Sequence, residues 1–322
     1  MNVEKVKKIS CLGAGTMGPG IALTFALAGY QVHMYSRSAA GIQRSFAVIN
    51  DLLEKFARHG LVELAQIQRI KAKIQGTTCL EEASEDTDFV IEAIAENLAL
   101  KQDLFAKLEQ FCSPTTIFAS STSGLSPTAL AQNLKYQERF VVAHFWNPPH
   151  LIPLVEVVPG ENTSQNTVAF TTELLKKAGK KPVVLKKETL GFIGNRLQLA
   201  MLREALALVE AGIASKEAVD ATVKYALGRR LAVTGPLESV DLGGLDIFQN
   251  IASYLIPDLC NLSQVPSLLT DNVRKGRLGV KTGAGFYDWT EESLENIKQL
   301  REDDLLSWLK KDQEGYLEYT SN

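Results

Sequence analysis

A histidine and a glutamate flank a proline-broken loop in a stretch that is otherwise apolar. His144 directly follows the short apolar run Phe140–Ala143, and Glu156 lies in a second apolar run between Val155 and Val157. A carboxylate in such a run is costly to bury unless a partner compensates its charge, and the histidine is the obvious partner. A paired histidine and glutamate in a partly dry site would act as a general base near neutral pH. The alternative is a structural core histidine beside a glutamate that faces solvent.

A glycine-rich sequence near the N-terminus has the spacing of a dinucleotide-binding loop. GAGTMG reads as GxGxxG between a predicted strand, Val6–Leu12, and a predicted helix, Thr16–Ala28. Glycines at these positions permit a tight turn, close approach of a pyrophosphate and packing of the helix on the strand. The helix N-terminus adds unpaired N–H groups for the phosphates. The loop residues that we expect at the cofactor are Gly13, Gly15, Thr16, Met17 and Gly18.

The residues after the second predicted strand bear on the choice between NAD and NADP. An NAD site usually has an acidic residue about 20 residues after the glycine loop, where it binds the ribose diol. Here the strand Gln31–Tyr35 is followed by Ser36 and Arg37. A serine lacks the two oxygens of a carboxylate, whereas a guanidinium suits a 2′-phosphate or the adenine ring. The pattern leaves NADP open beside NAD, and Arg37 has the alternative of a solvated surface charge.

The order of the predicted elements divides the chain into two parts. Up to about Lys187, short apolar strands alternate with helices, which indicates an α/β domain with a parallel sheet. Beyond it the pattern is helical and begins with the long run Ile193–Ala214. We therefore predict an α/β domain over residues 1–187 and an all-α domain over residues 188–322. The charged stretch Glu291–Tyr316 is predicted to form a surface helix.

Bulk properties exclude several classes of protein. The 322 residues carry a formal net charge of −3, which makes nucleic acid and anionic membranes poor partners. We expect no membrane span, because the chain has no uninterrupted apolar run of about 18 residues. The four cysteines are far apart and lack histidines at metal-ligand spacing, so we expect no metal site. Free cysteines and the lack of a secretory signal pattern favour the cytoplasm.

A set of motifs resembles a known family. In chain order the set includes GAGTMG, EAIAENLALKQDLF, AHFWNPP, PLVEVVPG, GFIGNRL and KTGAGFYDW. Their order and spacing are similar to those of the 3-hydroxyacyl-CoA dehydrogenases from about Lys8 to Trp289. The resemblance implies an α/β, Rossmann-type doubly wound N-terminal domain that binds NAD, and an all-α C-terminal domain that binds substrate and forms a homodimer. It also implies a cytoplasmic oxidoreductase of fatty acid metabolism that acts on the CH–OH group of a small molecule.

The resemblance also assigns roles to individual residues. His144 matches the catalytic base, Glu156 the glutamate that orients it, and Ser123 the serine that contacts substrate, histidine and cofactor. In such a reaction the histidine takes the hydroxyl proton while the nicotinamide takes the hydride. The other matches are Asn195 at the substrate and nicotinamide, Asn147 in the same pocket at substrate and cofactor, and Glu96 and Lys101 at the cofactor.

Departures from the family pattern leave the substrate open. Ser121 and Pro153 stand where the acyl-CoA enzymes usually have asparagine and lysine, and the stretch containing Arg230 is longer than usual. These features are similar to a side branch that includes L-gulonate 3-dehydrogenase (lambda-crystallin), carnitine dehydrogenase and a diketoreductase. The Arg230 guanidinium would suit a small carboxylate, with a helix-end salt bridge as the alternative. We predict a 3-hydroxyacyl-CoA (3-hydroxybutyryl-CoA) dehydrogenase; the alternative is a dehydrogenase of a free 3-hydroxy acid, and a remote one is a non-catalytic crystallin-like protein.

Overall fold

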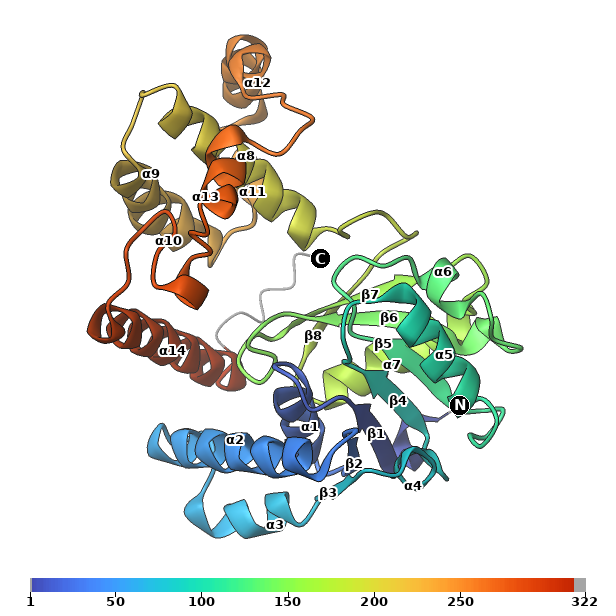
Figure 1. Ribbon diagram of the computed structural model, residues 1–322. Helices are drawn as coiled ribbons and strands as arrows, with labels where there is room; N and C mark the ends of the chain where they lie inside the picture. Colours follow the sequence, from blue (N-terminus) through green and yellow to red (C-terminus); the bar gives the residue numbers. More distant parts are fainter. Residues whose placement is uncertain (1, 316–322) are drawn as a thin grey trace. The chain divides into compact units, whose positions relative to one another are not determined.

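The computed structural model describes residues 2–315, which divide into two compact units (Figure 1). The first unit contains the chain up to Asn195 together with Leu305–Glu314, and the second contains Arg196–Asp304. The first is a sheet flanked by helices and the second is helical. The predicted fold class, a doubly wound α/β region followed by an all-α region, is therefore confirmed.

One eight-stranded sheet forms the centre of the first unit, with the strand order β3-β2-β1-β4-β5-β6-β7-β8. The chain winds outward from β1 to β3 and then returns to add β4 on the other side of β1. Such a reversal opens a crevice at the carboxyl ends of the two central strands, where doubly wound proteins bind their ligands. The strands are β1 (Lys8–Leu12), β2 (Gln31–Tyr35), β3 (Ile74–Thr77), β4 (Phe89–Glu92), β5 (Ile117–Ser120), β6 (Phe140–Phe145), β7 (Leu154–Pro159) and β8 (Lys181–Val184).

The sheet is parallel except between β6 and β7, which pair antiparallel. The predicted parallel sheet is confirmed for the other strand pairs and corrected for this one. Residues 146–153, which join the two strands, are too few for the crossover that a parallel pair requires. The antiparallel register places His144 directly opposite Glu156.

Helices cover both faces of the sheet and enclose two apolar cores (Figure 1). Successive strand residues point to opposite faces, so Ile91 joins the core beneath α1, α2 and α7 whereas Val90 joins the core beneath α4, α5 and α6. The helices of this unit are α1 (Gly18–Leu27), α2 (Ala39–Arg58), α3 (Ile67–Lys71), α4 (Leu80–Ser84), α5 (Leu98–Leu108), α6 (Pro127–Ala131) and α7 (Gln165–Lys177).

Side-chain caps define where several helices begin. The Ser38 hydroxyl accepts a hydrogen bond from the Gly41 amide at the start of α2. The Asn97 side chain does the same for Leu100 in α5. Helix α7 and strand β3 were not predicted, because α7 is rich in β-branched residues that disfavour helix and two of the four residues of β3 are exposed.

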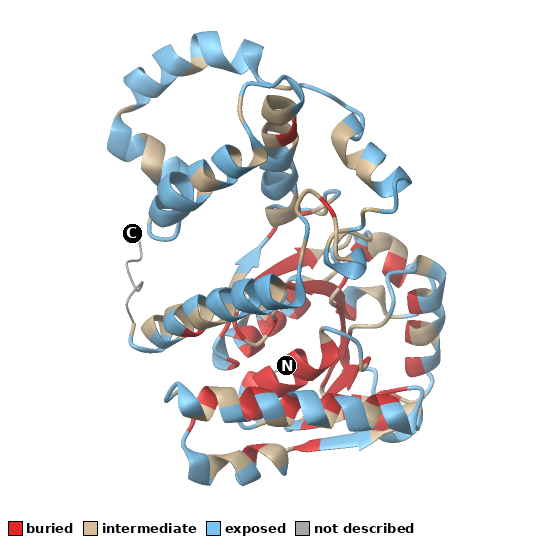
Figure 2. Ribbon diagram, turned by 60° about the vertical axis from the view of Figure 1, so that its left-hand side comes forward, coloured by how far each residue is buried: buried red, intermediate tan, exposed pale blue. Residues whose placement is uncertain are grey.

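The second unit buries little of its apolar surface. Leu206 is the one buried hydrophobic residue among its described residues, and most of the unit is exposed (Figure 2). Its elements are α8 (Gly194–Glu210, which begins in the first unit), α9 (Lys216–Thr222), a π-helical segment (Val223–Leu227), α10 (Gly228–Leu231), α11 (Pro236–Gly243), α12 (Leu245–Leu255), α13 (Ser267–Arg274) and α14 (Glu291–Gln313). Short 3₁₀ segments lie at Val3–Lys5, Leu64–Gln66, Gln137–Arg139, Ile256–Asp258 and Val280–Thr282.

Helix α14 corrects the prediction of a surface helix over Glu291–Tyr316. Its last part belongs to the first unit, where Leu306 is 3% exposed and joins the core of α1, α2 and α7. Asp312 also forms an ion pair with Lys181 of β8 at 2.9 Å. The many charges of the helix hide this short apolar contact, and Tyr316 lies outside the described residues. Within residues 2–315, no helix is both long and apolar enough to cross a membrane.

Candidate active site

The glycine loop lies where β1 ends, at the crevice beside β4. A side chain at Gly13, whose φ is +129°, would overlap the Ala93 carbonyl, and one at Gly18 would overlap the Gly13 carbonyl. A Cβ at Gly15 would meet no atom within 4 Å. Packing therefore explains the first and third glycines, whereas the open space at Gly15 fits the approach of a pyrophosphate. Helix α1 begins at Gly18, so Thr16 and Met17 lie in the turn before it.

Ser36 and Arg37 follow β2 in different environments. The Ser36 side chain is buried against the start of α2, where its hydroxyl accepts a long 3.4 Å hydrogen bond from the Ser38 amide. Arg37 is exposed and has no ion pair or hydrogen bond within residues 2–315. The serine thus supports the loop, whereas the guanidinium is free to approach a ligand.

The predicted His144–Glu156 pair is formed. His144 Nδ1 lies 2.8 Å from Glu156 Oε2, and the two side chains are only 6% and 1% exposed. Burial raises the pKa of Glu156, but hydrogen bonds from His144, Gly194 and Ile193 outweigh it, so the net pKa is lowered. The carboxylate therefore accepts the Nδ1 proton, which leaves Nε2 without a proton and able to act as a base.

Backbone amides at the start of α8 hold the other oxygen of the glutamate. Glu156 Oε1 accepts hydrogen bonds from the Ile193 amide at 2.8 Å and the Gly194 amide at 3.0 Å. A carboxylate is favourable at a helix N-terminus because unpaired N–H groups gather there. Phe192, with a φ of +51°, turns the chain at this point. Such a backbone conformation is uncommon for a bulky residue, and it often marks a functional site.

Ser123 and Asn195 meet, but the histidine is not part of this contact. The Asn195 Nδ2 group donates to the Ser123 carbonyl at 2.8 Å. The Ser123 amide and hydroxyl in turn donate to Glu96 Oε1, at 3.1 and 3.4 Å. Within residues 2–315 no hydrogen bond joins Ser123 to His144. The predicted contact of this serine with the histidine therefore stays a prediction.

Comparison with known proteins identifies the family. The sequence model described as "3-hydroxyacyl-CoA dehydrogenase, NAD binding domain" matches residues 8–189, and the one described as the C-terminal domain of the same family matches residues 191–289. The chain belongs to the 3-hydroxyacyl-CoA dehydrogenase family. The predicted resemblance is thereby confirmed, and NAD is the cofactor that the matched N-terminal domain binds.

Similar proteins in the family act on different substrates. The 5-formyl-3-hydroxy-2-methylpyridine 4-carboxylate 5-dehydrogenase of Mesorhizobium japonicum is 35% identical over 92% of this chain and 95% of its own. A crystal structure of a dehydrogenase of this compound, described as an NAD⁺-dependent dismutase, has a TM-score of 0.89 and 33% identity over 96% of this chain and 99% of its own. The structure of (S)-3-hydroxybutyryl-CoA dehydrogenase from Ralstonia eutropha has a TM-score of 0.75 and 33% identity, covering 89% and 100%.

In this member of the 3-hydroxyacyl-CoA dehydrogenase family, the two residues expected at the cofactor differ in burial. Lys101 is 1% exposed, and its ammonium lies between Glu92 at 2.6 Å and Glu96 at 3.3 Å. Glu96 is 44% exposed. Burial raises the pKa of Glu96, but hydrogen bonds from Thr122 and Ser123 and the charge of Lys101 lower it overall. Only Glu96 therefore presents a charged group to solvent.

Aromatic residues beside the histidine were missed by the sequence reasoning. The rings of Trp146 and Phe192 lie 5.2 and 5.6 Å from the imidazole, and Phe192 is only 1% exposed. They exclude water from the side of the imidazole that they cover. Their positions beside the predicted base, in AHFWNPP and GFIGNRL, are the signal that could have identified them. Asn147, next to Trp146, is exposed.

The predicted substrate residue Arg230 belongs to the second unit. It lies on α10, where it is exposed and where its carbonyl accepts hydrogen bonds from the Val233 and Thr234 amides. In residues 2–315 its guanidinium has no ion pair, so the helix-end salt bridge considered above is not formed. Its contact with a substrate carboxylate stays a prediction.

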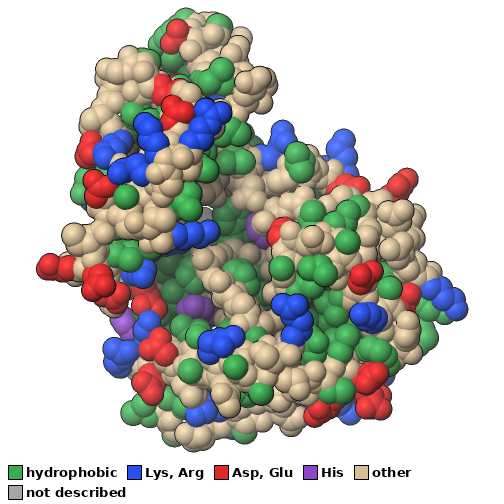
Figure 3. All heavy atoms as spheres, in the orientation of Figure 1, with side chains coloured by type: hydrophobic (Ala, Val, Ile, Leu, Met, Phe, Trp, Pro, Cys, Tyr) green, Lys and Arg blue, Asp and Glu red, His purple; other side chains and the backbone are tan. Residues whose placement is uncertain are grey.

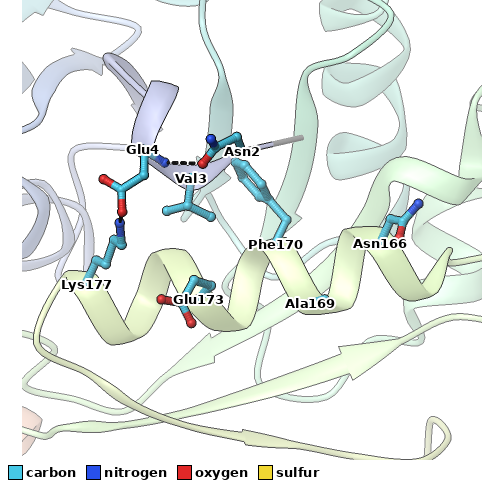
Figure 4. Close-up of a pocket in the computed structure, with 8 residues that line it drawn as sticks. All are labelled: Asn2, Val3, Glu4, Asn166, Ala169, Phe170, Glu173 and Lys177. Carbon is cyan, nitrogen blue, oxygen red and sulfur yellow. Dashed lines mark hydrogen bonds and ion pairs between the residues drawn. The ribbon is translucent and has the colours of Figure 1, made fainter.

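A surface pocket of the first unit lies away from all of these residues. It is lined by Asn2, Glu4 and residues of α7 such as Phe170 and Lys177 (Figure 4). A neighbouring pocket is lined by Tyr30 and Lys73, which precede β2 and β3. Both hollows therefore lie at the amino ends of strands, whereas His144 and the glycine loop lie at carboxyl ends. In a doubly wound sheet the carboxyl ends carry the ligand site, so we assign these pockets no role in the reaction.

Two remaining features of the described residues are the distribution of charged side chains and the arrangement of possible metal-ligating groups. On the face drawn in Figure 3, basic and acidic side chains are interspersed over the first unit. No group of three or more histidine, cysteine or carboxylate side chains within residues 2–315 is arranged to hold a metal ion.

His150, in the loop between β6 and β7, makes stability depend on pH. Its ring lies 6.0 Å from that of Phe56, and burial, with the charges of Lys180 and Lys55, lowers its pKa from 6.5 to about 4. Between these values the unfolded chain binds a proton that the folded chain does not, so stability falls as pH falls through this window. At pH 4.5 the free energy of unfolding should be about 2 to 3 kcal/mol lower than at neutral pH. We expect His150→Leu to remove this contribution to the loss of stability on acidification.

The measurement is urea unfolding of the parent and the variant at pH 7.5 and at pH 4.5. For each protein, the free energy of unfolding at pH 4.5 is subtracted from that at pH 7.5, and the two differences are compared. An effect of the substitution on packing that is the same at both pH values therefore cancels. Equal losses on acidification in both proteins would show that His150 does not contribute.

Proposed function

We propose that this protein is an NAD-dependent dehydrogenase that interconverts a 3-hydroxyacyl and a 3-ketoacyl compound, with a 3-hydroxyacyl-CoA such as 3-hydroxybutyryl-CoA as its substrate. The observation that carries the proposal is the buried 2.8 Å pair of His144 and Glu156 in a chain whose glycine loop has open space at Gly15. A base beside a dinucleotide site is what the oxidation of an alcohol requires.

In the proposed mechanism, His144 Nε2 removes the hydroxyl proton of the substrate. Glu156 fixes the tautomer of the imidazole and stabilises the imidazolium that forms. Ser123 and Asn195, which already contact each other at 2.8 Å, would donate hydrogen bonds to the substrate oxygen. NAD, when bound, accepts the hydride. For reduction, the protonated His144 returns its proton to the oxygen of the ketone.

The C-terminal segment favours a second candidate, a dehydrogenase of a free hydroxy acid. The family model ends at residue 289. The match to the structure of the pyridine carboxylate dehydrogenase covers 96% of the 322 residues of this chain. It therefore has to extend beyond residue 289. The structure of the hydroxybutyryl-CoA enzyme covers 89%. Basic residues that could bind CoA phosphates are few over 39–61, and Lys55 there already pairs with Asp51 at 3.2 Å.

A panel of two substrates and two cofactors tests the proposal. We expect NADH-dependent reduction of acetoacetyl-CoA, followed as loss of nicotinamide absorbance, and a much slower reduction of free acetoacetate and other free 3-keto acids. A clear preference for the free acids would establish the second candidate instead. No reduction of either class would contradict the proposal, and a crystallin-like binding protein would then be the remaining interpretation.

The same panel decides whether Arg37 contributes to the choice of cofactor. The exposed, unpaired guanidinium would attract a 2′-phosphate, so Arg37→Asp should lower kcat/KM for NADPH at least about tenfold, which is the size of one charged contact. The rate with NADH should be preserved. Equal NADPH rates in parent and variant would show that Arg37 does not bind the 2′-phosphate.

We also propose a cytoplasmic homodimer, formed by the helical domain over residues 188–322, with residues 1–187 as the cofactor domain. The support is that the second unit buries only Leu206 among its described hydrophobic residues. Helix α12 exposes Leu245 at 65% and Tyr254 at 66%. Apolar surface on this scale is normally covered by a partner. Sedimentation equilibrium should give twice the 35.3 kDa chain mass; a monomer at micromolar concentration would contradict the proposal.

A further inference from the structure

Glu92, which has no role so far, is a fully buried carboxylate at the end of β4. It is 0% exposed and lies in register between Leu12 of β1 and Ser120 of β5. The strands on its two sides therefore lead directly into the glycine loop and into the loop that carries Ser123. A charge at such a place is costly unless several donors compensate it.

Three donors surround the Glu92 carboxylate. Oε1 accepts from the Ile94 amide and from Lys101 Nζ, both at 2.6 Å, and Oε2 accepts from the Ser120 hydroxyl at 2.6 Å. Glu156 also has three partners, but they are one side chain and two backbone amides, whereas Glu92 has two side chains and one amide. The sheet thus holds two buried carboxylates, on β4 and on β7, and only Glu156 has been given a function.

Lys101 extends the network from Glu92 toward the Ser123 loop. Its buried ammonium is shared between Glu92 at 2.6 Å and Glu96 at 3.3 Å. Charge-assisted contacts of this kind fix the position of a long side chain more firmly than neutral hydrogen bonds do. The position of Glu96 is therefore coupled to that of Glu92 through Lys101.

The loop after β5 depends on side chains for its backbone hydrogen bonds. The Thr122 amide donates to the Ser120 hydroxyl at 3.3 Å, and the Ser123 amide donates to Glu96 at 3.1 Å. The next two amides, of Gly124 and Leu125, both donate to the Thr122 hydroxyl, which itself donates to Glu96. All four amides therefore donate to side chains that are connected to Glu92, either by a direct hydrogen bond or through Lys101 and Glu96.

We propose that Glu92 is a positioning residue that sets the place of Ser123 for the reaction, acting through Ser120 on one side and through Lys101 and Glu96 on the other. The consequence for activity rests on the proposed function, in which Ser123 binds the substrate oxygen. The consequence for the loop itself does not, because it follows from the hydrogen bonds alone.

The first test is a double-mutant cycle between Glu92→Gln and Ser123→Ala in the proposed dehydrogenase assay. Glu92→Gln alone should lower kcat about tenfold, the scale on which groups that orient active-site residues act. In the Ser123→Ala background it should lower kcat less than threefold, because the group it positions is gone. Equal losses in both backgrounds would overturn the proposal.

The matched control is Glu109→Gln, which breaks another buried ion pair of the same unit. Arg139 and Glu109 are 3.0 Å apart, with side chains 4% and 11% exposed, and neither belongs to the site. This variant should lower the melting temperature and leave kcat unchanged. If Glu92→Gln behaved in the same way, its role would be structural only. Should Glu92→Gln fail to fold, the double variant Glu92→Gln with Lys101→Met leaves neither partner of this pair as a lone charge. It should show the faster amide exchange of residues 122–125, and its kcat is not compared because Lys101 is expected at the cofactor.

The second test measures the loop directly, by amide hydrogen exchange without substrate. In Glu92→Gln the amides of residues 122–125 should exchange at least about tenfold faster than in the parent, while α7 is unchanged, as expected for a local opening. In Glu109→Gln they should exchange at the parent rate. An unchanged rate in Glu92→Gln would overturn the proposal. Failure of the proposed function can be distinguished from failure of this proposal. In that case the parent is inactive in the dehydrogenase assay, but the exchange rates of the parent and the variant can still be compared.

Discussion

Replacing His144 with alanine should lower kcat about a thousandfold, the middle of the range for removal of a general base. The imidazole is the one buried base in the described site, and its Nδ1 proton is bound by Glu156 at 2.8 Å. Without it the hydroxyl proton has to leave to solvent, next to the apolar rings of Trp146 and Phe192. The measurement is steady-state oxidation and reduction of the preferred substrate. The pH dependence of kcat/KM that comes from the imidazole should disappear as well.

Binding measurements separate a loss of chemistry from a loss of structure. NADH affinity of His144→Ala, measured by fluorescence, should stay within about threefold of the parent, because the side chain is not part of the glycine loop. The matched control is His33→Gln, a histidine of β2 on the same sheet, which should leave kcat unchanged. A His144→Ala variant as active as the parent would falsify the proposed mechanism.

The sequence predicts those parts of the site whose interacting residues lie close together along the chain. GAGTMG directly after an apolar strand predicts the cofactor loop, and the structure shows that packing requires Gly13 and Gly18 and leaves open space at Gly15. The apolar runs around His144 and Glu156 predict that the charge of Glu156 needs a partner, and the two side chains meet. In each case the residues that act together lie within one short segment, so their spacing carries the information.

Contacts between distant segments were harder to predict. The network of Glu92 joins β4, α5 and the loop after β5, and its members are ordinary polar residues until the sheet brings them together. The packing of Leu306 on the first unit is hidden in a highly charged helix. The antiparallel direction of β7 was not predicted, because alternating strands and helices usually indicate parallel pairing. Each of these depends on sheet order or register, which local periodicity does not specify.

Replacing Glu156 with glutamine should lower kcat about 10³- to 10⁴-fold, as neutralising the carboxylate of a catalytic triad does. Its Oε1 accepts two backbone amides, so the amide oxygen of glutamine would take that place. The amide nitrogen would then lie where Oε2 now is, 2.8 Å from His144 Nδ1. It would donate to Nδ1, which moves the imidazole proton to Nε2 and leaves no base for the substrate.

Comparison with Glu156→Ala tests this explanation, because the two variants should rank in opposite order for activity and stability. Glutamine keeps the volume and the hydrogen bonds from Ile193 and Gly194, so it should have the higher melting temperature. Alanine leaves those amides unpaired, but it lets the imidazole adopt the active tautomer, so it should keep the higher kcat. Melting curves and initial rates of the two proteins decide the matter. If glutamine retained more activity than alanine, the control of the tautomer would not be the function of Glu156.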